Sequence, residues 1–260
     1  MPPEAVVTLS PAHAPARRSA GMTVAKTVAI VQSNYIPWKG YFDLIGAADE
    51  FILADDLQYT RRDWRNRNRI KQPPGAAWLT IPVNVKGRYL QRIDETTIND
   101  PEWAERHRRT IHQAYARAPH FDDVRPTLEG LYADVARETH LSAVNERFLR
   151  ALCELLDVRT PITRSTDYRP EGARSERLLR LCLQAGATRY LSGPAARAYL
   201  DEDLFARHGI EVAWFDYTGY PEYEQLHPPF DHHVSVVDLL VHTGAAAPDF
   251  LLCARSRAAR

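Results

Sequence analysis

The chain has 260 residues, of which 45% are hydrophobic and 25% charged, a globular composition that excludes wholesale disorder. Its 33 basic residues balance its 33 acidic residues, so no global electrostatic field attracts it to nucleic acid or to an acidic membrane. Any bound anion must therefore be held by a local cluster of cations.

The N-terminal region is rich in alanine and proline and has no apolar core of the kind found in secretory signals. We expect residues 1–25 to form a disordered tail. Met22 is a candidate for the true start, because the first predicted strand begins shortly after it.

The first ordered segment predicts a βαβ unit. Residues 28–31 form a short apolar run typical of a buried strand, and residues 32–37 are turn-like. Apolar residues at helical spacing follow over 41–48, and a second apolar run over 51–54 ends at two aspartates. Strand, turn, helix and strand within such a short stretch favour a parallel sheet with a right-handed crossover.

The middle of the chain has a different pattern. Residues 57–74 are polar and strongly basic, and residues 78–83 resemble another strand. Asp100-Pro101-Glu102 opens a helix with a cap residue and a proline in the first turn. Two further helices with three-to-four spacing follow, so residues 102–157 are predicted to be a helical insertion.

The α/β rhythm then returns. Strands are predicted over 162–166, 190–191 and 212–215, and helices over 175–185, before Gly209 and over 235–242. We therefore expect one doubly wound, mostly parallel α/β domain of Rossmann-like type over residues 26–260, with the helical insertion between its halves.

Three cysteines, Cys153, Cys182 and Cys253, each lie in an apolar run without CxxC spacing. This pattern favours small buried hydrophobes in a reducing compartment, with a nucleophilic cysteine as the alternative. No apolar run approaches the ~20 residues that span a bilayer. The sequence thus predicts a cytoplasmic protein with no membrane partner.

Polar and aromatic residues gather at three predicted strand ends, where an open parallel sheet binds its ligands. These ends are Gln32–Trp38, Asp55–Gln58 and Ser192-Gly193. The pair Asp55-Asp56 has two interpretations: a turn with a helix cap, or a carboxylate that orients a hydroxyl or amine, or acts as a base. Two adjacent carboxylates are only a weak indication of a metal.

The segment Arg61–Lys71 holds six basic residues against one acid, the strongest local charge feature of the chain. Three interpretations remain open. It is a solvated loop, an anion site for phosphate, diphosphate or carboxylate, or a surface for single-stranded nucleic acid in which Trp64 alternates with the cations.

Asp238 and His242 share one face of the last predicted helix, a spacing compatible with metal ligation. Ser235-Val236-Val237-Asp238 also matches a capping box, which explains the same residues by backbone hydrogen bonds. We favour the cap and expect no metal. The standard signatures GxGxxG, GxxxxGK[ST], HExxH and GxSxG are absent from the sequence.

The motifs Gln32–Phe42, Asp55–Tyr59, Arg67–Lys71 and Trp78–Val83 resemble those of the WbqC-like family. The likeness continues in Tyr190–Gly193, Tyr223–Gln225, Phe230 and Ser235–Leu240, so that it covers about residues 27–245. Ser33 departs from the proline usual in the family. The resemblance implies a cytoplasmic bacterial protein of surface-polysaccharide and natural-product biosynthesis, with a role in sugar modification or in acyl or aminoacyl transfer.

The resemblance and the strand ends together predict one site. Its catalytic residues are expected to be Asp55, Asp56 and Lys71, and its substrate-binding residues Gln32, Tyr35, Trp38, Tyr41, Gln58, Arg67, Asn68, Ser192, Gly193, Tyr223 and Gln225. Arg67 and Lys71 would hold a phosphate or carboxylate, Trp38 and Tyr41 would stack on a ring, and an aspartate would deprotonate the attacking amine.

The leading hypothesis is thus a transferase that acts on the amino group of an amino-sugar or natural-product precursor. Its expected partner is a small molecule; nucleic acid is not expected, apart from a tRNA-borne donor, and the cofactor stays undefined. A weaker resemblance to HIGH-type nucleotidyltransferases of HUP fold places Trp38–Tyr41 where that superfamily has HxGH. The alternatives are therefore a nucleotide-dependent ligase or nucleotidyltransferase, and a non-catalytic binding module.

Overall fold

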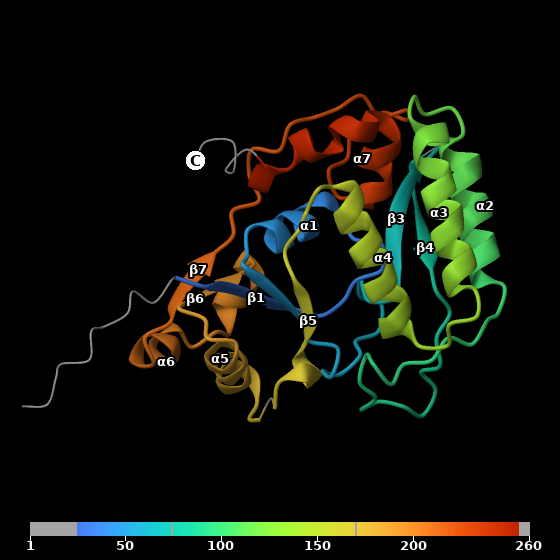
Figure 1. Cartoon of the computed structure of the whole chain (residues 1–260). Coiled ribbons are helices and arrows are strands. Elements are labelled where there is room, and N and C mark those ends of the chain that lie inside the picture. Colours follow the sequence, from blue (N-terminus) through green and yellow to red (C-terminus); the bar gives the residue numbers. More distant parts are fainter. Residues whose placement is uncertain (1–24, 74, 170, 255–260) are drawn as a thin grey trace, which may run out of the picture.

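The structure is a computed structural model that describes residues 25–73, 75–169 and 171–254 (Figure 1). The candidate start Met22 and all but the last residue of the predicted tail lie outside the described residues.

A five-stranded parallel sheet forms the centre of the molecule. Its strands are β1 (Thr27–Val31), β2 (Glu50–Leu53), β5 (Ile162–Arg164), β6 (Arg189–Ser192) and β7 (Glu211–Trp214), in the order β5-β2-β1-β6-β7. Renumbered within the sheet, this order is 3-2-1-4-5, which is compatible with a Rossmann-like fold. The direction of strand order reverses between β1 and β6, and that point is where such sheets bind ligands.

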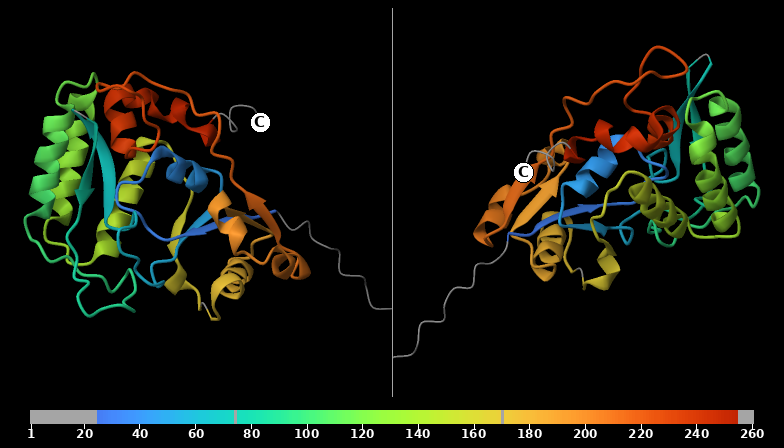
Figure 2. Two further views of the ribbon diagram at one scale, coloured as in Figure 1. Left: turned by 180° about the vertical axis from the view of Figure 1, so that it is seen from behind. Right: turned by 45° about the horizontal axis from the view of Figure 1, so that its top comes forward.

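Helices cover both faces of the sheet. In Figures 1 and 2, α1 (Lys39–Gly46) and α7 (Val236–Thr243) lie on one side, and α5 (Arg174–Gln184) and α6 (Glu202–Arg207) on the other. Successive strand residues point to opposite faces, so Ile52 packs in the cluster under α5 and Leu53 in the cluster with α1. Because both faces are buried, the strands read as continuous apolar runs, which is why the sequence predicts them well.

The middle of the chain forms an antiparallel hairpin and three helices. The hairpin consists of β3 (Arg67–Gln72) and β4 (Gly75–Thr80), and the helices are α2 (Trp103–Tyr115), α3 (Phe121–Val135) and α4 (Leu141–Leu155). The sequence did not predict β3, because its buried face carries the polar Asn68 beside Ile70. The strand expected over 78–83 is β4, which ends earlier, at Thr80.

The C-terminal part contributes to the core. The stretch Val236–Ala254 combines α7 with the 3-10 helix η3 (Gly244–Phe250), and it alone among the described residues is long and apolar enough to cross a membrane. This corrects the expectation that no such run exists. Since 61% of it is buried inside the fold, it behaves as a core helix, and cytoplasmic location stays a prediction.

Candidate functional site

A cavity of about 350 Å³ opens at the point where the strand order reverses. Its polar and aromatic lining comes from the end of β1 and from α1 (Gln32, Trp38, Tyr41), from the end of β6 (Ser192, Gly193), from α5 (Arg174, Arg177), and from Tyr199 and Tyr217. We call it the strand-end cavity. Five of the residues predicted to bind substrate therefore lie together, at the edge of the sheet where the sequence places them.

Aromatic rings form one wall of the strand-end cavity. The ring centroids of Trp38 and Tyr217 lie 5.3 Å apart. The Tyr41 hydroxyl donates a hydrogen bond to the Gln32 carbonyl at 2.8 Å, which fixes the turn after β1 to α1. A Cβ atom on Gly40 would lie 2.3 Å from the Trp38 indole, so only glycine accommodates this position of the ring.

Two guanidinium groups supply the positive charge of the cavity. Arg174 and Arg177 stand in the first turns of α5, where the helix dipole also favours an anion. Arg174 is exposed, whereas Arg177 is half-buried. Among the described residues that line the cavity, none is Asp or Glu. The lining therefore suits a ligand that carries a flat ring and a phosphate or carboxylate.

A second cavity, of about 250 Å³, lies at the ends of β2 and β5, and we call it the acidic cavity. Its acidic lining residues are Asp55, Asp56, Asp94 and Glu146. The Asp55 carboxylate accepts hydrogen bonds from the Ser33 backbone N–H at 2.7 Å and from the Ser142 hydroxyl at 2.5 Å. Burial raises the pKa of Asp55, and these hydrogen bonds oppose the shift.

An ion pair connects the two cavities. Asp56, which lines the acidic cavity, is paired with Arg177, which lines the strand-end cavity. The other carboxylate oxygen of Asp56 accepts a hydrogen bond from the Ser165 hydroxyl at 2.5 Å. The ionised pair thus stands between the strand-end cavity and the acidic cavity, whose lining also includes Arg164, paired with Glu146 at 2.7 Å.

Tyr35 and Asn68 lie in the protein interior and line neither cavity. The Tyr35 hydroxyl bonds to the Tyr132 hydroxyl at 2.5 Å and to His107 Nδ1 at 2.9 Å, and burial raises the pKa of Tyr35. The Asn68 side chain donates to the carbonyl oxygens of Tyr35 and Ile36 at 3.1 and 3.0 Å. Both residues therefore connect the turn after β1 to the hairpin and the helices.

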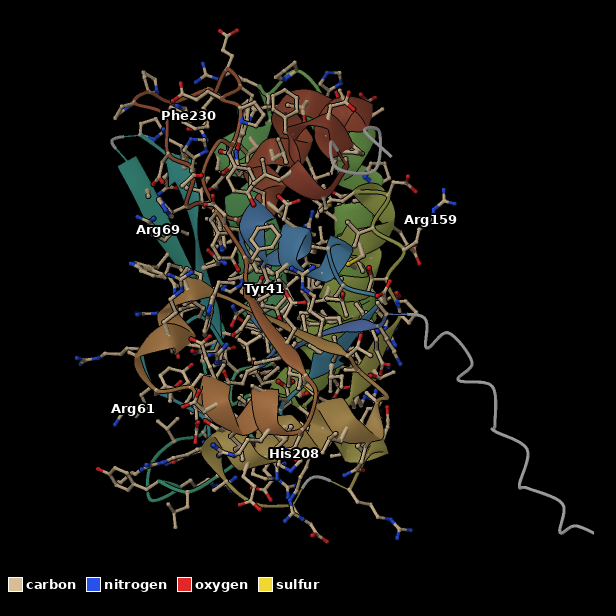
Figure 3. All side chains as sticks on the ribbon, turned by 90° about the vertical axis from the view of Figure 1, so that its left-hand side faces the viewer. Tyr41, Arg61, Arg69, Arg159, His208 and Phe230 are labelled. Atoms are coloured by element: carbon tan, nitrogen blue, oxygen red, sulfur yellow. The ribbon has the colours of Figure 1, made fainter. Side chains whose placement is uncertain are left out.

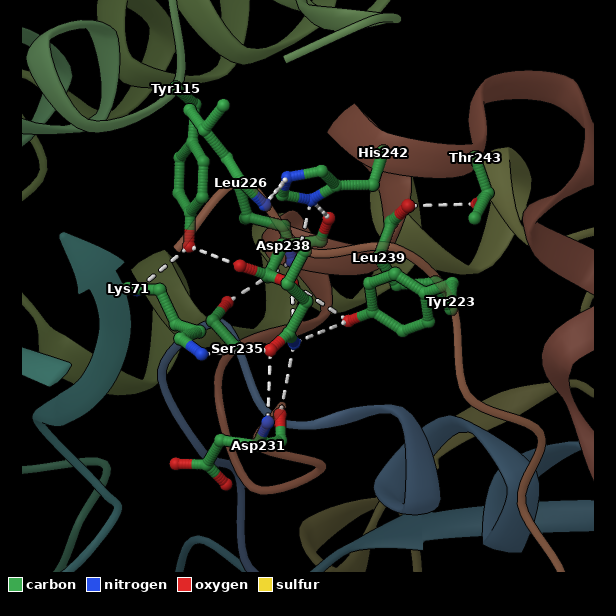
Figure 4. A network of polar contacts seen from close by, with 12 residues as sticks. Lys71, Tyr115, Tyr223, Leu226, Asp231, Ser235, Asp238, Leu239, His242 and Thr243 are labelled. Atoms are coloured by element: carbon green, nitrogen blue, oxygen red, sulfur yellow. Dashed lines mark hydrogen bonds and ion pairs between the residues drawn. The ribbon is translucent and has the colours of Figure 1, made fainter. Parts of the chain in front are cut away.

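Lys71, Tyr223 and Gln225 belong to a polar network centred on Asp238. Figure 4 shows Lys71, Tyr223 and Asp238 in this network. Lys71 Nζ donates to Gln225 Oε1 at 3.0 Å and to the Pro229 carbonyl. Gln225 Nε2 and the Tyr223 hydroxyl both donate to Asp238 Oδ1 at 2.8 Å. These three predicted site residues lie together, but none of them lines the strand-end or the acidic cavity.

The capping box expected at the start of α7 is only half formed. The Ser235 hydroxyl accepts a hydrogen bond from the Val237 N–H at 3.3 Å, but the Asp238 carboxylate turns to the network. His242 Nε2 accepts from the Leu226 N–H at 2.9 Å and Nδ1 donates to the Asp238 carbonyl at 2.7 Å, so both ring nitrogens have protein partners. In the described part of the chain, no cluster of three or more His, Cys, Asp or Glu side chains could hold a metal.

The remaining two predicted residues, Gln58 and Arg67, lie on the surface around the hairpin. Gln58 is exposed and donates to the Tyr89 carbonyl at 2.7 Å. The Arg67 guanidinium lies 4.1 Å from the centroid of the Trp78 ring. The structure therefore does not bring all predicted residues into one cleft, but distributes them over two cavities, the interior, one polar network and this surface.

Sequence reasoning missed Arg174, Arg177 and Tyr217. The available signal was the spacing of Arg174 and Arg177, which are three apart and therefore share a helix face near the start of a predicted helix. Tyr217 follows a predicted strand end, as the other lining residues do.

All three cysteines are buried, and none of them forms a disulfide in the described part of the chain. Burial raises the pKa of the Cys153 and Cys182 thiols to about 12, so their thiolates are disfavoured at neutral pH. This environment matches the expected role as small hydrophobes.

The fold and the site define an α/β protein with a parallel, Rossmann-like sheet and a ligand-sized cavity at its switch point. The chain belongs to the WbqC-like protein family, whose model matches residues 32–250. A relative from Mycobacterium tuberculosis (strain ATCC 25618 / H37Rv), named "Uncharacterized protein Rv1507c", is 51% identical over 226 residues, which cover 87% of this chain and 97% of that relative. No solved structure matches the chain significantly.

Proposed function

We propose that this protein is a biosynthetic transferase that binds an anionic small molecule in the strand-end cavity and transfers a group to an amine. The observation that carries the proposal is the cavity at the switch point, with an aromatic wall on one side and Arg174 and Arg177 on the other. Such a lining matches a nucleotide, a sugar nucleotide or an acyl-CoA, each of which joins a flat ring to phosphates.

The neighbouring acidic cavity supports an amine as the acceptor. A protonated amine entering this space meets the carboxylate of Asp55, whereas Asp56, Asp94 and Glu146 line the same space but are paired with arginines. The amine must lose a proton before or during attack, and a buried carboxylate with a raised pKa suits the role of base. In the proposed step the protonated amine first gives one proton to Asp55; its nitrogen then bonds to the transferred group, the bond to the leaving group breaks, and the second N–H proton departs with the leaving group.

Asp55 would act in this step by exchanging one partner. Its hydrogen bond from the Ser33 backbone holds the carboxylate in place, whereas the Ser142 hydroxyl can rotate away when an amine arrives. Arg177 would bind the anion of the donor beside Asp56. The roles proposed for Arg67 and Lys71 as anion ligands thus pass to the two arginines of α5.

The first experiment tests binding. Purified protein is melted with nucleotides, sugar nucleotides, acyl-CoAs and amino acids, since a ligand at about 100 times its Kd stabilises by about 2.7 kcal/mol. Arg174→Ala should lower the affinity of a binding compound at least several-fold. The matched control is Arg207→Ala, an exposed arginine on α6 that does not line the cavity and should leave affinity unchanged.

The second experiment tests transfer. The bound compound is incubated with amine acceptors, and products are detected by mass spectrometry. Asp55→Asn should abolish turnover while retaining the thermal shift, and unchanged turnover would remove Asp55 from the mechanism. Pyrophosphate release that requires ATP and Mg²⁺ would instead favour a nucleotidyltransferase, and binding without product over all acceptors would favour a binding module.

A further inference from the structure

A basic and aromatic surface surrounds the β3–β4 hairpin, away from both cavities. Trp64 and Trp78 are 40% and 45% exposed, and their ring centroids lie 5.4 Å apart. The Arg67 guanidinium stacks on Trp78 at 4.1 Å. Isolated exposed tryptophans are common, but these two are in contact, with their planes tilted by 39°, and together with the arginine stacked on Trp78 they form an aromatic platform with a positive charge.

A groove of about 620 Å³ adjoins this platform. Arg61, Lys86 and Arg88 line it together with Tyr59 and Tyr89, and Tyr89 is 80% exposed. Among the described residues that line the groove, none is Asp or Glu. In a chain with no net charge, three cations without an acid mark a local site for a polyanion.

The groove and the platform are neighbours: the hydroxyl of Tyr59, which lines the groove, donates to Oδ1 of Asn66 at 2.9 Å, and Asn66 directly precedes Arg67 of the platform. Burial raises the pKa of Tyr59, the nearby cations Arg61, Arg67 and Arg65 oppose that shift, and Asp63, which is paired with Arg65, adds to it, so cations outnumber this acid around Tyr59. Figure 3 shows Arg61 and Arg69 on the same side of the molecule and Arg159 on the opposite side.

We infer that this surface binds single-stranded nucleic acid. The cations of the groove would contact successive phosphates, and unpaired bases would stack on Trp64, Trp78 and Tyr89. A duplex keeps its bases stacked on one another, so it could use only the charges. An acidic polysaccharide could likewise use the charges, but it has no flat bases to place on the tryptophans.

The test measures binding of a fluorescein-labelled oligoadenylate RNA of about 12 nucleotides by anisotropy, at several salt concentrations. We expect Trp78→Ala to weaken binding by about 5- to 150-fold and Trp78→Phe to restore most of it, since stacking on an aromatic ring persists. Arg61→Ala should reduce the slope of log K against log salt by about 0.7, the contribution of one phosphate contact on a single strand.

The matched control for Arg61→Ala is Arg159→Ala, another exposed arginine, which should change neither affinity nor slope. Circular dichroism of each variant separates loss of binding from loss of fold. No binding at low salt, equal affinity for a duplex or for heparin, or unchanged affinity of a folded Trp78→Ala would each overturn the inference.

Discussion

Asp238→Ala should cost the protein about 2–4 kcal/mol of unfolding free energy. The Asp238 side chain is fully buried, and its carboxylate accepts hydrogen bonds from the Tyr115 hydroxyl at 2.9 Å and from the Tyr223 hydroxyl and Gln225 Nε2 at 2.8 Å. These donors come from α2 and from the segment before α7, so one carboxylate connects parts of the chain that are far apart in sequence (Figure 4).

The magnitude follows from the burial of the three donors. Tyr115 is fully buried and cannot reach water, so its orphaned hydroxyl costs about 1–3 kcal/mol. Tyr223 and Gln225 are half-buried and can recover part of their hydrogen bonding from solvent, so each contributes less. Asp238→Asn should cost only about 1 kcal/mol, because the amide oxygen still accepts from one or two of the donors.

Urea unfolding followed by circular dichroism measures these differences as shifts of the midpoint at constant m. Tyr115→Phe provides the internal check, because it removes the donor that Asp238→Ala leaves unpaired. In the Tyr115→Phe background, the cost of Asp238→Ala should fall by about 1 kcal/mol or more. If Asp238→Ala stays within about 0.5 kcal/mol of the parent, the network does not stabilise the fold and the reasoning fails.

Three further predictions concern buried groups and the cavity wall. Burial lowers the pKa of His107 to about 4, so the folded state binds a proton less readily than the unfolded state. As the pH falls from 6.5 to 4, the free energy of unfolding should therefore decrease by about 3 kcal/mol, and a folded His107→Gln variant should not show this decrease. Urea midpoints measured at each pH test the prediction. Lys39 lies 5.0 Å from the Tyr220 ring centroid, and burial lowers its pKa to about 8. Charged Lys39 therefore weakens the folded state below that pH, and any stability advantage of Lys39→Met should shrink as pH rises from 8 to about 10; a constant difference would contradict this. Gly40→Ala should displace the Trp38 indole, change its fluorescence and weaken binding of any strand-end ligand while the protein stays folded; unchanged affinity would place Trp38 outside the binding wall.

The parallel sheet could be predicted from the sequence because strands that are buried on both faces consist of consecutive apolar residues. Ile30 and Ile52 face α5 while Ala29 and Leu53 face α1, so both strands appear as unbroken apolar runs. Strand β3 has no such run. Its inner face holds polar Asn68, which bonds to carbonyl groups of the turn after β1, and this partner cannot be known before the chain is folded.

The site could be predicted only in part, for a geometric reason. The order of the strands brings the ends of β1 and β6 together, so Gln32 and Ser192 meet at the switch point as expected. At the end of β2, however, Ala54 lines the strand-end cavity, whereas Leu53, Asp55 and Asp56 line the acidic one. One strand end therefore serves two cavities, which the sequence interpretation had treated as one.

Charge clusters that are continuous in sequence and clusters that form in space have different origins in this protein. The run Arg61–Lys71 is strong in sequence because its residues are neighbours, but the fold gives them different surroundings: Arg67 lies against Trp78, whereas Lys71, on the same face of β3, bonds to Gln225 in the polar network. Among the described residues that line the strand-end cavity, the cations are Arg174 and Arg177 on α5, and Arg177 is paired with Asp56, which follows β2. The net charge adds up all residues, whereas the fold places basic and acidic residues in different parts of the structure. A chain with no net charge can therefore have a basic surface, a cationic cavity and an acidic cavity at the same time.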